Sequence, residues 1–135
     1  MAQSIEGRSR ELLEQPNFCH VGSLREDGSP HVVPVWVDTD GSYALLNTAE
    51  GRVWANNAER DPRLALTVPN RENPYEYVTI RGRVEEITRE GADEHIDKLA
   101  KKYLGLDEYP LRQPGEQRVI LRVSAERVHH MDPGS

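Results

Sequence analysis

The segment 32–62 constrains the fold most strongly, because it contains a hairpin that runs directly into a helix. Alternating apolar residues with a central tryptophan predict the first strand, and an acidic, glycine-containing tetrapeptide predicts the turn. A second apolar run predicts the returning strand, and a threonine follows it at a position suited to capping a helix. The predicted elements are a strand at Val32–Val37, a turn at Asp38–Gly41, a strand at Tyr43–Leu46 and a helix at about 50–59 capped by Thr48.

The start of this predicted helix is a candidate anion site. The first backbone N–H groups of a helix have no partner within it, and its dipole favours a negative charge there. Arg52 would add a full positive charge and a fork of donors. The simpler alternative is that Thr48 only caps the helix and that Arg52 is only a solvated side chain.

The remaining elements follow from periodicity and from turn residues. A short helix at Ser9–Gln15 should end before Pro16, because proline disfavours helical geometry in the residue that precedes it. Gly82, inside a long strand, indicates a bulge or a close backbone approach. The other expected elements are strands at Phe18–Leu24, Leu64–Val68, Tyr77–Ile87 and Val119–Val123, and a helix at about Arg89–Leu104 capped by Thr88 and ended by Gly105.

These elements amount to six antiparallel strands with few helices, which predicts a mainly β fold. A closed or partly split barrel removes the exposed edges that an open sheet would have to protect. The chain has 135 residues and shows no linker or internal repeat, so we expect a single domain over residues 1–135.

Composition narrows the function classes. A net charge of −6 argues against non-specific nucleic-acid binding, and no apolar run approaches the roughly 20 residues that a membrane span requires. Cys19 is the only cysteine and is expected to be a buried thiol. The N-terminus lacks a signal-peptide pattern. We therefore expect a cytoplasmic protein whose partners are small molecules rather than nucleic acid or membrane.

No familiar catalytic constellation is present. The 5 histidines show no metal-ligand spacing, so no metal site is expected, and Glu85 and Glu86 are interpreted as a strand end. The sequence therefore identifies no nucleophile or general base. An enzyme of this kind would depend on a cofactor that carries the reaction.

An ordered set of motifs resembles the flavin-binding split-barrel family, within it the pyridoxamine-5'-phosphate-oxidase-like enzymes that use the deazaflavin coenzyme F420. The resemblance covers about residues 8–130. The motifs are His31–Trp36, Asn47–Arg52, Arg60–Arg63, Asn73–Tyr77 and Ile80–Gly82, with Tyr103–Gly105 and Tyr109–Gly115 resembling one branch.

The resemblance implies a homodimer with the cofactor in a groove at the subunit interface. The ring system would lie against the strand residues Val33, Pro34, Val35 and Trp36. The phosphate would lie at Asn47, Thr48 and Arg52, with Asn57 near the same helix.

Trp54 departs from the family pattern, since many members carry there a lysine that adds a second charge on the phosphate. An indole cannot neutralise a phosphate, but it can stack on a ring, wall the pocket, or pack on the barrel or the dimer interface. Tyr75 or Tyr77 would supply a proton or pack at the interface. Arg112, like Arg71 and Arg81, would bind an acidic cofactor tail or remain a surface charge.

The function that the resemblance implies is an F420-dependent oxidoreductase that transfers a hydride between the reduced cofactor and a conjugated organic substrate. An FMN-dependent oxidoreductase of the pyridoxamine-phosphate-oxidase type is the alternative within the fold. A non-catalytic flavin or haem carrier and a purely structural dimer module are alternatives from other classes.

Overall fold

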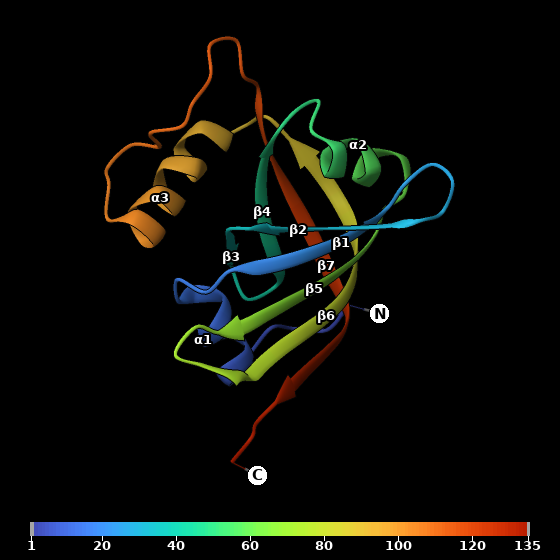
Figure 1. Cartoon of the computed structure of the whole chain (residues 1–135), viewed down its shortest axis with the longest axis vertical. Helices are drawn as coiled ribbons and strands as arrows, with labels where there is room; N and C mark the ends of the chain where they lie inside the picture. The colour runs from blue at the N-terminus through green and yellow to red at the C-terminus, as the bar shows by residue number, and fades with distance from the viewer. Residues whose placement is uncertain (1, 135) are drawn as a thin grey trace.

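The computed structural model describes residues 2–134, in which one antiparallel sheet is accompanied by three helices (Figure 1). The helices are α1 (Gly7–Glu14), α2 (Val53–Arg60) and α3 (Ala92–Leu104). The strands are β1 (Cys19–Leu24), β2 (Pro30–Val35), β3 (Val37–Thr39), β4 (Tyr43–Ala49), β5 (Arg63–Asn70), β6 (Asn73–Thr88) and β7 (Arg118–Met131). Their order in the sheet is β2-β1-β5-β6-β7-β4-β3.

A single chain segment supplies both edges of this sheet. β2 pairs with β1 at one edge and β3 pairs with β4 at the other, yet only Trp36 separates β2 from β3. The sheet is therefore curled into a half-barrel, which confirms the expected split-barrel class. The expected single strand Val32–Val37 is wrong, and the sheet has seven strands instead of six within the described residues. At the corner, the Val37 N–H donates to the hydroxyl of Tyr103.

The core lies inside the curl of the sheet and is closed at one end by α1. Leu12 and Leu13 of α1 are fully buried, as are Val78 and Ile80 of β6. Along α3, Ile96, Leu99 and Ala100 are buried. The buried residues of β6 thus alternate along the strand and those of α3 are three or four positions apart, which are the spacings of a half-buried strand and of an amphipathic helix.

The bulge expected at Gly82 is confirmed. The β6–β7 register shifts between Arg81 and Gly82, and a Cβ at Gly82 would collide with the backbone carbonyl oxygen of Ser124. Only a residue without a side chain allows β7 to approach this closely.

The expected starts of two helices are wrong. α2 begins at Val53 with Arg52 at the N-cap position, because β4 stays paired with β7 through Ala49 and the chain turns only at Gly51, which has a φ of 93°. Thr48 is thus a strand residue and caps nothing.

α3 begins at Ala92 after Gly91, while the Thr88 hydroxyl accepts a hydrogen bond from the Glu90 N–H instead of capping the helix. The helix ends at Gly105, in the left-handed conformation, as expected.

Lys102 anchors α3 to the rest of the barrel. Its Nζ donates to the carbonyl oxygens of Leu13 (2.5 Å) and Val37 (2.6 Å), and burial lowers the pKa of Lys102 to about 8. Cys19 lies nearby as a buried thiol, as expected, and burial raises its pKa to about 12, so it is a poor nucleophile. None of the helices in the described part of the chain has the length and apolar character needed to cross a bilayer.

Candidate functional site

A groove of about 250 Å³ opens between the β2–β3 corner, the end of β4 and the start of α2. It brings together chain segments that are far apart in the sequence. Seven of the expected site residues line it. Its lining residues are Phe18, Pro34, Val35, Trp36, Asn47, Thr48, Arg52, Trp54, Ile96, Tyr109, Leu111 and Arg118.

Aromatic rings form one wall of the groove. Trp36 stacks on Tyr103 with ring centroids 5.1 Å apart and planes at 7°, and Tyr109 meets Trp36 edge-on at 5.8 Å. The Tyr103 hydroxyl donates to the Asn17 carbonyl (2.6 Å) and accepts from the Val37 N–H (3.1 Å), which fixes the ring. Such a rigid, flat, apolar wall suits a planar ring.

Two guanidinium groups form a cationic corner of the groove. Arg52 lies at the turn before α2 and Arg118 is the first residue of β7, where it pairs with Ala49 in the sheet. Arg52 has a half-exposed side chain, whereas that of Arg118 is only 3% exposed. Both approach the same carboxylate oxygen, Oε1 of Glu116, at 3.5 Å and 3.2 Å. We refer to Arg52, Arg118 and Glu116 as the guanidinium corner.

Neither Arg118 nor Glu116 was predicted from the sequence as a site residue. No local motif marks an arginine at the start of a strand, and Arg118 comes near Arg52 only because β4 and β7 are paired. The signal that would have found it is the strand register, which a single sequence does not contain.

Thr48 also lines the groove. Thr48 is 1% exposed, and its Oγ1 has no hydrogen-bond partner among the described residues. Buried hydroxyl groups are nearly always hydrogen-bonded. Thr48 thus brings to the lining of the groove a buried hydroxyl that no described group satisfies.

The side-chain amide of Asn47 is committed to the protein interior. Its Nδ2 donates to the Ala92 carbonyl (2.9 Å) and to His95 Nδ1 (3.1 Å), and its Oδ1 accepts from Arg118 Nε (2.9 Å). Asn47 therefore contributes to the groove by holding Arg118 and the start of α3 in place, and its amide has little hydrogen-bonding capacity left for a ligand.

His95 and Asp38 support Asn47 from behind. Because His95 Nδ1 accepts a hydrogen bond from the Asn47 amide, the ring N–H is assigned to Nε2, which lies 3.6 Å from Asp38 Oδ2. Burial raises the pKa of Asp38, but the facing His95, the Thr39 N–H and Lys98 outweigh this and hold the pKa below its usual range. The carboxylate is thus ionised and lies behind the imidazole.

Trp54 is both a wall of the groove and part of the core. Its side chain belongs to the main apolar cluster, the residue is 4% exposed, and it lines the groove beside Arg52. Wall and barrel packing, two of the interpretations open for Trp54, therefore coexist in the structure.

The other expected site residues lie outside the groove of the protomer. Val33 packs against the core, and Asn57 is buried, with its amide donating to the Ser23 hydroxyl. Tyr75 is 78% exposed and Tyr77 half-buried, both near the start of β6. Arg112 pairs with Asp97 of α3 at 3.0 Å. A cofactor-binding role for each of them stays a prediction.

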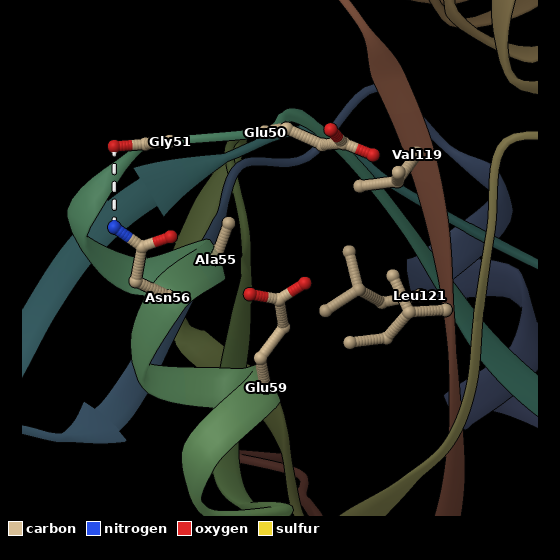
Figure 2. Close-up of a pocket in the computed structure, with 8 residues that line it drawn as sticks. Glu50, Gly51, Ala55, Asn56, Glu59, Val119 and Leu121 are labelled. Carbon is tan, nitrogen blue, oxygen red and sulfur yellow. Dashed lines mark hydrogen bonds between the residues drawn. The ribbon is translucent and has the colours of Figure 1, made fainter.

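A second, much smaller cavity lies against a different face of α2, where Ala55 and Glu59 point toward Val119 and Leu121 (Figure 2). Its volume of about 10 Å³ holds about one water molecule, so it is too small for a cofactor. Among residues 2–134, no cluster of His, Cys, Asp and Glu side chains has the arrangement of a metal site.

Comparison with known proteins defines the family. The model of the pyridoxamine 5'-phosphate oxidase family matches residues 5–132, nearly the whole chain, and the chain belongs to this family. A search of curated proteins gives no match.

Solved structures agree with this assignment. An F420 reductase is 30% identical, with a TM-score of 0.78 over 89% of this chain and 94% of that protein. A conserved hypothetical protein from Mycobacterium tuberculosis (21% identity, TM-score 0.72, 97% and 86% coverage) shares the fold. HupZ from Group A Streptococcus (19% identity, TM-score 0.70, 95% of each chain) also shares it. The family and the F420 reductase together place the chain among flavin- and deazaflavin-type oxidoreductases.

The internal role of Asn47 is testable by an isosteric apolar replacement. Asn47→Leu leaves the Ala92 carbonyl, His95 Nδ1 and Arg118 Nε without a partner. We expect the free energy of unfolding, measured by urea denaturation, to fall by about 2 kcal/mol or more, because each unsatisfied buried group costs roughly 1–3 kcal/mol. Asn56→Leu, at an exposed position of α2, is the matched control. An equal, small loss in both variants would contradict the internal role.

Proposed function

We propose that this protein is an F420-dependent oxidoreductase that acts on an unsaturated, conjugated organic substrate. The observation that carries the proposal is the groove of about 250 Å³, whose lining combines an aromatic wall with a guanidinium corner. A phosphorylated deazaflavin contains a planar ring and a phosphate. The aromatic wall suits the ring, and the guanidinium corner suits the phosphate.

The guanidinium corner fits a phosphate. Most N–H donors of Arg52 are uncommitted, since the contact of its guanidinium with other described side chains is the 3.5 Å ion pair with Glu116. The Thr48 hydroxyl adds an unpartnered donor, and the first N–H groups of α2 follow Arg52 directly. Forked guanidinium donors and a helix start are the usual partners of phosphate oxygens in proteins.

The aromatic wall fits a flat ring. Trp36 is held by the Tyr103 ring behind it, and Val35 and Pro34 extend the same apolar surface. When bound, a reduced deazaflavin supplies a hydride to an electron-poor carbon of the substrate. The residues of this chain would hold the ring and the substrate at reacting distance and exclude water from between them.

Tyr103, behind the aromatic wall, is not suited to act as the proton donor. The hydroxyl of Tyr103 already donates to the Asn17 carbonyl, and burial raises its pKa above the usual range. Tyr75 and Tyr77 lie outside the groove of their own protomer, so either would reach substrate only from a second copy of the chain.

The choice of F420 over FMN rests on the similarity to the F420 reductase, since that structure is 30% identical to this chain. FMN also combines a planar ring with a phosphate, and it remains the alternative cofactor. The carrier hypothesis is separated from both enzymes by turnover, because a carrier binds the cofactor but oxidises none of it in the presence of substrates.

We also propose a homodimer that completes the groove. An open, largely apolar hollow with a volume of about 340 Å³ adjoins the groove and shares Phe18 and Pro34 with it. Val32 on the same edge strand is 65% exposed and Tyr75 is 78% exposed, beside Pro74 of that hollow. Exposed apolar patches of this kind mark interaction sites.

Cofactor titration tests the proposed function. We expect the purified protein to bind F420 more tightly than FMN, followed by fluorescence or absorbance. Arg52→Gln should weaken binding by roughly tenfold to a hundredfold, because a charge-assisted hydrogen bond contributes about 1.5–3 kcal/mol. Arg10→Gln, on the exposed face of α1, removes the same charge elsewhere and should leave the affinity unchanged. Tighter FMN binding would instead identify the FMN-dependent alternative.

The dimer is tested by sedimentation at micromolar concentration. We expect twice the monomer mass of 15.3 kDa, and a shift toward the monomer in Val32→Asp, because a charge on that apolar strand would be buried without a partner. A wild-type protein of monomer mass throughout the concentration range would rule the dimer out.

A further inference from the structure

We propose that Arg118 is the second cation of the phosphate site and that Glu116 is an internal carboxylate which occupies both guanidinium groups until a phosphate replaces it. This inference rests on the proposed function and deepens it. It supplies the second charge that Trp54 cannot provide. It also assigns a role to a buried acid that cofactor binding would otherwise leave unexplained.

The position of Arg118 is fixed by the fold. Its strand neighbour is Ala49, at the end of β4, and its Nε donates to Asn47 Oδ1, so the guanidinium is held at the floor of the groove. The Tyr109 ring lies 5.1 Å from its central carbon and covers one face. An arginine held in this way presents its remaining N–H donors to the groove with little loss of side-chain freedom.

Glu116 contacts the two arginines through one oxygen only. Oε1 lies 3.2 Å from Arg118 and 3.5 Å from Arg52, whereas Oε2 is buried and has no hydrogen-bond partner among the described residues. A carboxylate matched to a guanidinium uses both oxygens in two parallel hydrogen bonds. The geometry at Glu116 is therefore a weak pairing that a ligand with more acceptor oxygens would replace.

The charges of the guanidinium corner favour replacement of the Glu116 carboxylate by a phosphate. Two arginines and one glutamate leave the corner with a formal charge of +1. A phosphate entering beside the ionised carboxylate would meet repulsion from it, and a phosphate that displaces it would meet two free cations. Glu116 therefore lowers the affinity for every anion in proportion to the strength of its own contacts.

The chain around Glu116 allows such a displacement. Glu116 belongs to the long connection between α3 and β7, which rises away from the sheet in Figure 1. Gly115 precedes it with a φ of 76°, and the Glu116 N–H donates to the Gln113 carbonyl within the same loop. Movement of this loop would withdraw the carboxylate without disturbing the strand that holds Arg118.

A purely structural role for Glu116 makes the opposite prediction. If the carboxylate only holds Arg118 in place, its loss should loosen the arginine and weaken the binding of anions. If the carboxylate competes with phosphate, its loss should strengthen that binding. The sign of the change in affinity therefore separates the two roles.

The test is Glu116→Gln, which keeps the shape of the side chain and removes its charge. We expect the full-length variant to bind F420, or FMN if that is the cofactor, about tenfold more tightly, the order expected for one charge interaction near a protein surface. Riboflavin, which has the ring and no phosphate, should bind the wild type and the variant equally. Glu50→Gln is the matched control, because Glu50 pairs with Arg89 and faces the small cavity of Figure 2.

Unchanged or weaker binding of the phosphorylated cofactor by Glu116→Gln would overturn the inference and leave the proposed function intact. Failure of the wild type and of every variant to bind F420 or FMN would refute the proposed function. In that case, the binding of inorganic phosphate, followed by the rise in Tm, tests the guanidinium corner separately. A larger phosphate-induced rise in Tm for Glu116→Gln than for Glu50→Gln supports the competing carboxylate, and equal rises overturn it.

Discussion

The contact between Trp36 and Tyr103 is the interaction on which the rest of the structure depends. At Trp36 the chain passes from one edge of the sheet to the other. At that corner the Tyr103 hydroxyl accepts a hydrogen bond from the Val37 N–H. The stacked rings then form the wall of the groove. One aromatic pair thus closes the barrel, fixes α3 against it and creates the apolar surface on which the proposed cofactor would lie.

Pairing between β4 and β7 has the same importance for the polar half of the site. This pairing holds Thr48 in the β-sheet, so that α2 begins only after Gly51. It also brings Arg118 beside the end of β4. The cationic corner is thus produced by strand register rather than by a contiguous motif. This explains how an acidic protein, with a net charge of −6, presents two arginines to one anion.

Much of the fold could be predicted from the sequence because the signals are local. The apolar alternation along β6, the apolar face of α3, the bulge at Gly82 and the helix end at Gly105 each depend on residues within one element. The sequence also placed Pro34, Trp36 and Arg52 at the groove. The start of α2 was mispredicted because the pairing partner of Thr48 lies about 70 residues away. Arg118 and the inward commitment of Asn47 depend on contacts equally distant in the sequence, which residue patterns do not contain.

A crystal structure of the protein with F420 tests the central claim most directly. The account predicts a planar ring against Trp36, a phosphate bound by Arg52, Arg118 and the Thr48 hydroxyl, and Glu116 turned away from both arginines. Density for the cofactor on another face of the protein, with the Glu116 carboxylate still between the two guanidinium groups, would contradict it.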